Sequence, residues 1–319
     1  MRALITGYSG FVGPYLAQHL LESGDEVYGV LFEPEFRPPD FQLDVALKTQ
    51  TALCDLTDAA ATLVLIRSVR PEAIYHMAAQ SHVPLSWMKP AETFEANVIG
   101  TIHVLEAGRQ AAPEARILVV SSGDIYGAPG EGDIPLTESS PIRPLNPYSV
   151  SKASQDQIAE VYAKAHGQAI VRVRPFNHTG PGQSPRFVCP AFAQQLARIK
   201  LGLAPPRIRV GDLTALRDFL DVRDVSRAYR LALTQGRPGD VFNVASGRPQ
   251  SIRSILDCLI ALGGVEVTVE TDPERYRPSD VPLVCASAEA LERATGWRPE
   301  IPFEKTLADL LDFFLKTEG

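Results

Sequence analysis

The chain opens with an apolar run that leads into three spaced glycines, and no other feature limits its fold as strongly. Residues 3–5 are apolar or small, Gly7, Gly10 and Gly13 follow, and leucines then recur at helical spacing. The pattern predicts a strand, a tight turn and a helix. Gly7 permits the turn, Gly10 lets the backbone approach a pyrophosphate, and Gly13 lets the helix pack closely on the strand.

This turn is a candidate dinucleotide site because N–H groups at a helix N-terminus face phosphates. An ordinary glycine-rich turn is the alternative, but the position directly after the first strand favours binding. The residues predicted to contact a cofactor here are Gly7, Gly10, Phe11, Val12 and Gly13.

Strand and helix patterns alternate through the first half of the chain. Strands are predicted at 26–32, 51–56, 73–79, 116–122 and 170–175, and helices at 14–22, 59–69, 91–111 and 146–166. Residues 33–50 are polar and contain three prolines, so we expect a loop there. Nearly continuous apolar strands that alternate with helices indicate a parallel sheet covered on both faces. The predicted fold class is therefore α/β, with a Rossmann-type doubly wound parallel sheet.

The pattern changes beyond about residue 178, where glycines and prolines crowd together and strict alternation ends. We expect residues 1–177 to form the dinucleotide-binding domain and to carry the catalytic residues. Residues 178–319 are expected to form mainly a smaller, partly discontinuous substrate-binding region, with some return of the chain to the first domain.

Composition and charge limit the classes of partner. A hydrophobic fraction of 45% and a charged fraction of 22% are typical of soluble globular proteins. The net charge of −7 argues against nucleic acid, so phosphate groups must be held by local donors. No stretch approaches the ~20 apolar residues that cross a bilayer, and the four cysteines lack metal-ligand spacing. Because the first strand begins at once, we expect no signal peptide. The lack of an apolar span predicts no membrane partner, and the scattered cysteines predict no metal site and reduced thiols in a cytoplasmic protein.

Acidic residues after the second and third strands bear on the choice of dinucleotide. A carboxylate after the second strand binds a ribose 2′-hydroxyl, whereas an arginine accommodates a 2′-phosphate. Glu33 is the nearest carboxylate but is displaced from the usual site, and Arg37 lies four residues further on. The choice between NAD and NADP therefore stays open, with a lean to NAD. Asp55, followed by Leu56, is an adenine contact or, equally, a turn or capping aspartate.

Tyr148 and Lys152 are the residues at which we expect the chemistry. A helix beginning at Asn146 places them four residues apart on one face. The pKa of a free tyrosine is about 10, and a lysine cation within about 4–6 Å favours the phenolate and lowers that pKa. Ser121 and Ser122 end a predicted strand, at the edge where ligands bind in such sheets, and can hydrogen-bond the carbonyl oxygen that the tyrosine protonates. The alternative is a solvated tyrosine with a surface lysine.

Four segments together resemble the extended short-chain dehydrogenase/reductases that act on nucleotide-sugars. They are residues 6–13, 76–80, 97–101 and 148–152. The resemblance covers almost the whole chain and implies NAD(P)H as the cofactor, with Ala78 and Ala79 among its contacts. It also implies that Tyr148 is the acid/base, that Lys152 lowers the pKa of Tyr148 and contacts the nicotinamide ribose, and that Ser122 polarises the sugar carbonyl.

Four segments of the second half resemble the GDP-4-keto-6-deoxy-mannose reductases, also called GDP-rhamnose synthases. They are residues 174–183, 209–213, 217–225 and 277–282. The resemblance implies reduction of the C4 ketone of GDP-4-keto-6-deoxy-D-mannose to GDP-D-rhamnose. It implies that Asn177, Arg217 and Arg277 hold the nucleotide diphosphate and that Val210 lines the base pocket.

The predicted helices at 91–111 and 146–166 resemble the pair through which family members dimerise. We therefore expect a homodimer.

The main alternative is a GDP-mannose 4,6-dehydratase, or another nucleotide-sugar dehydratase or epimerase, that uses tightly bound NAD(P). Elimination needs additional proton carriers, whereas reduction of a ketone needs only the tyrosine. Gly123 offers no acid, and Asp124 is one methylene shorter than the glutamate usual in dehydratases. Asp124 stays a candidate catalytic residue, or else orients a substrate hydroxyl. A dinucleotide-sensing regulator without turnover would be expected to lack Tyr148 or Lys152.

Overall fold

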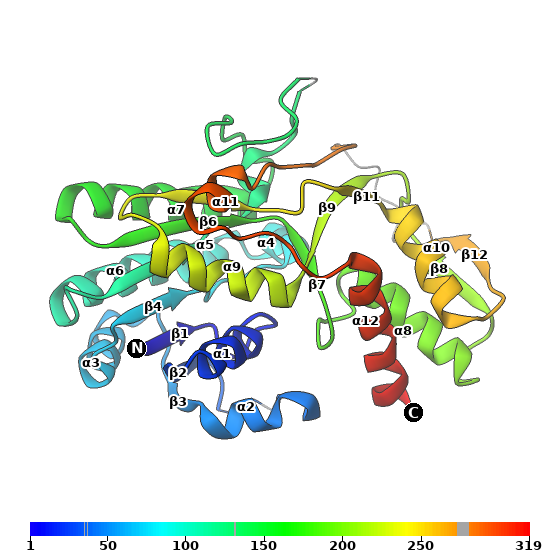
Figure 1. Ribbon diagram of the computed structural model, residues 1–319, viewed down its shortest axis with the longest axis horizontal. Helices are drawn as coiled ribbons and strands as arrows, with labels where there is room; N and C mark the ends of the chain where they lie inside the picture. The colour runs from blue at the N-terminus through cyan, green and yellow to red at the C-terminus, as the bar shows by residue number, and fades with distance from the viewer. Residues whose placement is uncertain (35, 37, 131, 273–280) are drawn as a thin grey trace.

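A seven-stranded parallel sheet forms the centre of the computed structural model, which describes residues 1–34, 36, 38–130, 132–272 and 281–319 (Figure 1). In order across the sheet, its strands are β10 (Val241–Val244), β6 (Ile170–Pro175), β5 (Arg116–Val120), β4 (Ala73–His76), β1 (Arg2–Thr6), β2 (Glu26–Leu31) and β3 (Gln50–Leu53). The winding direction reverses between neighbouring β1 and β4. This topology confirms the Rossmann-type doubly wound sheet, in which ligands are expected to bind outside the carboxyl ends of the strands at this reversal.

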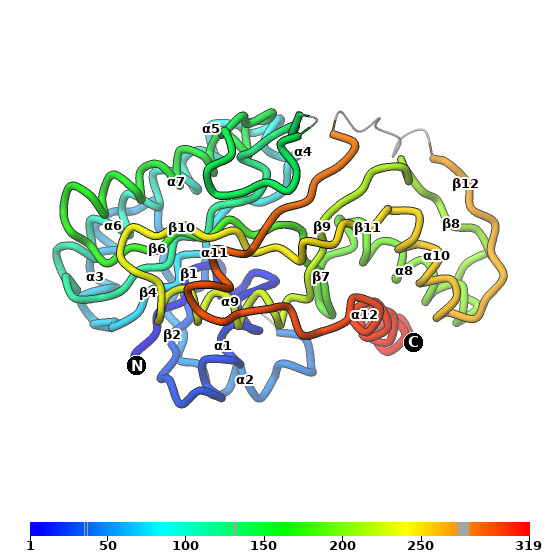
Figure 2. The backbone as a smooth tube through the Cα atoms, turned by 45° about the horizontal axis from the view of Figure 1, so that its top comes forward, coloured from blue at the N-terminus to red at the C-terminus, as the bar shows by residue number. Residues whose placement is uncertain are grey.

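Helices cover both faces of the sheet. One face carries α1 (Gly13–Glu22) and α9 (Val222–Gln235), which pack on each other, with α2 (Leu43–Lys48) beside α1 and α11 (Glu289–Thr295) beside α9. The other face carries α3 (Ala59–Val69), α6 (Gly100–Ala111) and α7 (Pro147–His166). The backbone trace in Figure 2 shows these layers from a second direction.

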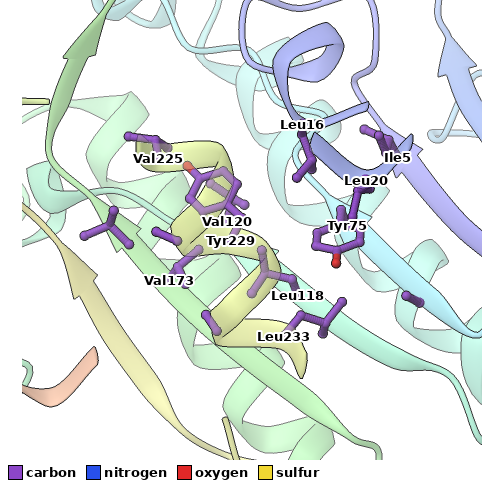
Figure 3. Packing of buried hydrophobic residues seen from close by; sticks show 14 of the residues in the cluster. Ile5, Leu16, Leu20, Tyr75, Leu118, Val120, Val173, Val225, Tyr229 and Leu233 are labelled. Atoms are coloured by element: carbon purple, nitrogen blue, oxygen red, sulfur yellow. The ribbon is translucent and has the colours of Figure 1, made fainter. Parts of the chain in front are cut away.

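Successive residues of each central strand supply two different cores. The core beneath α1 and α9 contains Ile5, Leu16, Leu20, Tyr75, Leu118, Val120, Tyr229 and Leu233 (Figure 3). The core on the opposite face contains Leu4, Leu65, Ile74, Val104, Ile117 and Val119. Because both faces are covered, the strands are apolar along nearly their whole length, as the sequence pattern predicted.

The stretch predicted as a loop at 33–50 contains helical structure instead. A short 3₁₀ helix, Asp40–Gln42, leads into α2, and Val45 of α2 is buried in the core next to α1. The helix is held by this tertiary contact, which the local composition does not reveal. The strand predicted at 51–56 is also shifted, because β3 ends at Leu53.

The helix predicted at 91–111 is three consecutive pieces. It begins as α5 (Pro90–Phe94), widens into a π-helical segment, Glu95–Ile99, and continues as α6. A short helix before it, α4 (Val83–Met88), was not predicted. It starts near Pro84, where the sequence shows no extended helical periodicity.

The remaining elements form a smaller region beside the central sheet (Figures 1 and 2). Its core is built by α8 (Val188–Lys200), α10 (Ile252–Gly263), α12 (Phe303–Glu318) and the parallel pair β8 (Arg207–Val210) and β12 (Thr268–Thr271). A three-stranded sheet contains β7 (Asn177–Thr179), β9 (Leu216–Asp221) and β11 (Pro249–Ser251). Between β9 and β11 the chain returns to the central sheet to form α9 and β10. In the described ranges, no helix combines the length and apolarity needed to cross a bilayer.

Candidate active site

The glycine turn after β1 is pressed against the chain that leaves β4. Gly7 has a φ of +72°, which residues with side chains rarely adopt, and a Cβ there would lie 2.8 Å from the Ala78 backbone. A Cβ on Gly13 would collide with the backbone of Tyr8, so α1 begins in close contact with the turn. Both glycines are therefore required by the packing of this turn.

Backbone donors line the same turn. The Gly10 N–H donates to the Gly7 carbonyl at 3.0 Å, while the N–H groups of Phe11 and Val12 have no acceptor among the described residues. Ala78 and Ala79 are partly exposed beside them. Unpaired N–H groups at a helix N-terminus, on a surface that no Cβ blocks, fit the pyrophosphate of a dinucleotide.

Glu33, Asp55 and Leu56 follow β2 and β3, on the same edge of the sheet. Glu33 and Asp55 are exposed. One oxygen of Asp55 accepts from the N–H and the hydroxyl of Thr57, at 2.9 and 2.8 Å, which is a turn role. Leu56 is buried. Roles of these three residues in cofactor binding, and the choice between NAD and NADP, stay predictions; Arg37 lies outside the described residues.

Tyr148 stands in the first turn of α7, where a capping box fixes the helix start. The Ser149 N–H donates to Asn146 Oδ1 at 2.8 Å, and the Asn146 N–H donates to Ser149 Oγ at 3.1 Å. Ser122 lies just beyond β5, and its hydroxyl hydrogen-bonds the Tyr148 phenol. The fold therefore brings together the predicted acid and the predicted carbonyl-polarising hydroxyl.

The surroundings of Tyr148 keep its phenol protonated. Burial raises the pKa of Tyr148 above its ordinary value, the negative charge of Asp124 raises it further, and the hydrogen bond from Ser122 opposes both. The phenol therefore carries a proton at neutral pH, although the raised pKa makes it a weaker acid than a free tyrosine. The lowering of this pKa by Lys152 stays a prediction, because the ammonium makes its hydrogen bonds elsewhere in this structure.

Lys152 is buried one turn further along α7. Its Nζ donates to the Val120 carbonyl and to Gln155 Oε1, each at 2.5 Å. Burial lowers the pKa of Lys152 to about 7, and Asp156 counteracts part of that effect. Gln155 was not singled out from the sequence, since a lone glutamine on a helix is usually solvated.

A cavity of about 780 Å³ lies between the carboxyl edge of the sheet and the smaller region. Three residues predicted to bind the nucleotide, Asn177, Val210 and Arg217, line it together. The fourth, Arg277, lies outside the described residues. Burial raises the pKa of the Asp124 carboxyl, and the positive charge of Arg217 opposes this rise only in part, so the net shift is upward.

The cavity wall also contains His82, Arg186 and Arg209, which the sequence reasoning did not select. Arg209 stands in a segment that had been compared with the reductases, and Arg186 follows the glycine- and proline-rich stretch. These positions are a weak signal for function, because arginines at such places are usually solvated. Within the described part of the chain, no group of three or more His, Cys, Asp or Glu side chains is placed to hold a metal ion.

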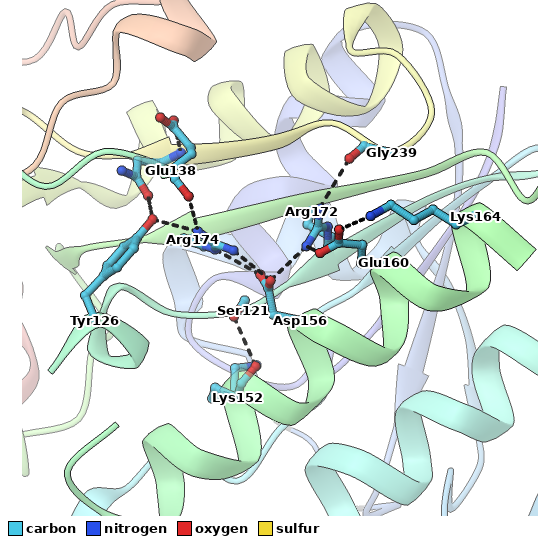
Figure 4. Close-up of polar contacts among 11 residues, drawn as sticks. Ser121, Tyr126, Glu138, Lys152, Asp156, Glu160, Lys164, Arg172, Arg174 and Gly239 are labelled. Carbon is cyan, nitrogen blue, oxygen red and sulfur yellow. Dashed lines mark hydrogen bonds and ion pairs between the residues drawn. The ribbon is translucent and has the colours of Figure 1, made fainter. Parts of the chain in front are cut away.

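A buried ion-pair network fixes α7 against the sheet (Figure 4). Two nitrogens of Arg174 on β6 donate to the Asp156 carboxylate, at 2.8 and 3.1 Å, and Arg172 donates to the same carboxylate at 2.9 Å. Arg174 also donates to the Tyr126 hydroxyl at 2.9 Å. Tyr126 belongs to the 3₁₀ helix η3 (Gly123–Tyr126), which carries Asp124. The network therefore connects the helix of Tyr148 and Lys152 to the segment that follows Ser122.

Comparison with known families identifies the chain. The sequence model described as GDP-mannose 4,6 dehydratase matches residues 4–310. The chain belongs to the GDP-mannose 4,6-dehydratase family. This membership confirms the resemblance to the extended short-chain dehydrogenase/reductases that the motifs carry.

Individual relatives include reductases and dehydratases. The chain is 36% identical over 310 residues to GDP-6-deoxy-D-mannose reductase of Pseudomonas aeruginosa, covering 97% of this chain and 96% of that one. It is 30% identical to GDP-mannose 4,6 dehydratase 2 of Arabidopsis thaliana, covering 97% and 86%. The solved structure of RMD from Pseudomonas aeruginosa complexed with NADPH has a TM-score of 0.85 and 33% identity, covering 99% and 100%.

Proposed function

We propose that this family member is an NAD(P)H-dependent nucleotide-sugar 4-ketoreductase that converts GDP-4-keto-6-deoxy-D-mannose to GDP-D-rhamnose. The observation that carries the proposal is a buried, protonated Tyr148 phenol beside the Ser122 hydroxyl, at the sheet edge next to the glycine turn. The similarity to a reductase over nearly the whole length of both chains supports it. A bound NAD(P)H supplies the hydride.

The residues of this chain supply binding and proton transfer. Ser122 hydrogen-bonds the C4 carbonyl oxygen, and Tyr148 donates its proton to that oxygen as the ketone becomes an alcohol. We assign the positive charge of the site to Lys152, one turn further along α7. Asn177, Val210 and Arg217 hold the nucleotide in the cavity, and Arg277 is assigned to the same task from the sequence alone.

Arg217 gives a direct test of the nucleotide site. Charge-assisted hydrogen bonds contribute about 1.5–3 kcal/mol each, so Arg217→Ala should raise the KM for the GDP-sugar about 10- to 100-fold with a smaller effect on kcat. Arg207→Ala, an exposed arginine of β8 outside the cavity, is the control and should behave as wild type. Steady-state kinetics against sugar concentration decides; an unchanged KM in the Arg217 variant would remove that residue from the site.

Dehydration of GDP-mannose is the second candidate, and Asp124 is the observation that favours it. Its negative charge acts on Tyr148, and burial raises its own pKa above the ordinary value of an aspartate. Asp124→Asn should leave ketone reduction within a few-fold of wild type, because reduction needs no second acid. An enzyme that eliminates water through this carboxyl would lose about 10²–10⁴ of its rate.

Cofactor accounting separates the two functions. A reductase should oxidise added NAD(P)H in proportion to GDP-4-keto-6-deoxy-D-mannose supplied by a separate dehydratase, and should leave GDP-mannose alone unchanged. The absorbance of reduced nicotinamide and the identity of the sugar product are measured together. Conversion of GDP-mannose without any added reduced cofactor would contradict the proposal and support the dehydratase.

We further propose a homodimer that packs through α7 and the helices beside it. Exposed apolar side chains on these elements support this: Ile99 is 42% exposed, Val150 38% and Val161 59%. Light scattering should give twice the mass of one chain at micromolar concentration. Val161→Glu should shift the protein toward monomer, whereas Val64→Glu, on the exposed side of α3, should not. A wild-type monomer under these conditions would contradict the dimer.

We also propose a cytoplasmic location. Cys54, Cys189, Cys258 and Cys285 are free thiols, which fits a reducing compartment. Fractionation of cells that produce the protein tests this assignment.

A further inference from the structure

Gln155 lies between Lys152 and a chain of buried polar groups that leads back to the glycine turn. It is fully buried on α7, three residues after Lys152, and therefore on the same side of the helix. The Lys152 Nζ donates to its Oε1, and its Nε2 donates to Thr101 Oγ1 at 2.8 Å. Both ends of the amide are thus engaged.

The number of available protons fixes the donor and the acceptor of each hydrogen bond along this row of buried polar groups. Thr101 donates its single hydroxyl proton to the Asn97 carbonyl at 2.6 Å, so it can only accept from Gln155 and from His76 Nε2, the latter at 2.9 Å. His76 Nε2 therefore carries the proton, and Nδ1 accepts from the Thr6 hydroxyl at 2.8 Å. Burial lowers the pKa of His76 to about 3, which keeps the ring neutral, as this pattern requires.

At its other end, this row of hydrogen-bonded groups reaches the glycine turn. Thr6 Oγ1 accepts from the N–H groups of Met77 and Ala78, each at 3.2 Å. Ala78 is the residue against which Gly7 is packed. An amide flip at Gln155 would point its NH₂ at the ammonium and its oxygen at a hydroxyl with no proton to give. The oxygen is therefore held toward Lys152.

We propose that Gln155 is a positioning residue that holds the Lys152 side chain in its charged form at the catalytic site. It acts through Lys152 and touches neither the phenol nor Ser122. The inference rests on the proposed role of Lys152 in ketone reduction, but the contact itself belongs to the protein without cofactor.

The charge on Lys152 depends on few neighbours. Asp156 on α7 acts on this charge directly, and the charge of Lys152 in turn lowers the pKa of His76 on β4. Arg172 and Arg174 of β6 pair with Asp156, and Asp124 of η3 acts on Tyr148 in the first turn of α7. The carboxylate of Asp156 favours the ammonium but is shared with two arginines. The Gln155 oxygen is a neutral acceptor that favours the charged form without such competition.

Two substitutions at Gln155 should shift the pKa of Lys152 in opposite directions. Gln155→Met removes the acceptor, which should lower the pKa of Lys152, so that the ammonium is lost at lower pH. Gln155→Glu places a carboxylate there, which should raise that pKa by about one unit or more. Gln157→Glu adds the same charge at an exposed position of the same helix and should leave the pKa of Lys152 unchanged.

The test reads Lys152 in two ways. NMR titration of lysine side chains labelled at Cε, with Lys152 assigned from Lys152→Met, gives its pKa in the cofactor-free protein. In the pH profile of kcat, activity should be lost at a lower alkaline pH in Gln155→Met than in the wild type, and at a higher pH in Gln155→Glu. Shifts of the same sign in both variants, or none in either, would overturn the inference. If the titration moves as expected but no ketone is reduced, the contact stands and the proposed function fails.

Discussion

Tyr148→Phe is expected to reduce kcat for ketone reduction by about 10²–10⁴-fold, the range that a positioned general acid contributes. The substitution removes only the hydroxyl, which lies beside Ser122, so the site should keep its shape. Affinity for NAD(P)H should stay nearly unchanged, because the predicted cofactor contacts are mainly those of the glycine turn. Single-turnover reduction monitored by nicotinamide absorbance, with cofactor binding measured by calorimetry, separates the two effects.

A matched control exists on the same helix. Tyr162 of α7 donates to Glu106 at 2.9 Å, away from the sheet edge, and Tyr162→Phe should keep the wild-type rate. A Tyr148→Phe enzyme that turned over at the wild-type rate would show that another group donates the proton, and the assignment of the acid would be wrong.

Asp156→Asn is expected to cost about 3–5 kcal/mol of unfolding free energy, because it removes the charge that neutralises two buried arginines. The Asp156 side chain is 1% exposed, and those of Arg172 and Arg174 are each 5% exposed. Glu160 still pairs with Arg172, at 2.8 Å, but among the described residues Arg174 would retain no carboxylate partner. The loss should lower the thermal midpoint by roughly 10 °C.

The control for this prediction is an exposed ion pair of the same kind. Asp257 pairs with Arg253 on α10, and their side chains are 52% and 58% exposed. Asp257→Asn should change stability by no more than about 1 kcal/mol. Urea unfolding of both variants gives the comparison, and equal effects would mean that the buried network does not hold α7 in place.

Local signals made the centre of this protein predictable. Gly7 and Gly13 after the first strand are each required by a backbone angle or a close contact, and Asn146 followed by Pro147 marks the start of α7 where the capping box forms. A tyrosine and a lysine four residues apart are placed by helix geometry alone. These features depend on residues close together in the chain, and the sequence displays them directly.

What the sequence did not reveal depends on distant partners. The short helix α2 is held by burial of Val45 against α1, so its proline-rich and polar surroundings were interpreted as a loop. Gln155 gains its significance from Thr101, 54 residues away. Arg186 and Arg209 both line the cavity because the fold brings β8 and the loop before α8 to the same wall.

The most direct measurement follows the hydride and the proton in a single reaction. With reduced nicotinamide carrying deuterium at the transferred position, the account predicts one deuterium at C4 of GDP-D-rhamnose from GDP-4-keto-6-deoxy-D-mannose, and loss of that transfer in Tyr148→Phe. Mass spectrometry and NMR of the product locate the label. A parallel reaction supplies GDP-mannose in deuterated water. Conversion of that sugar without label at C4 from the nicotinamide, and with deuterium from the solvent at C5, would contradict the account.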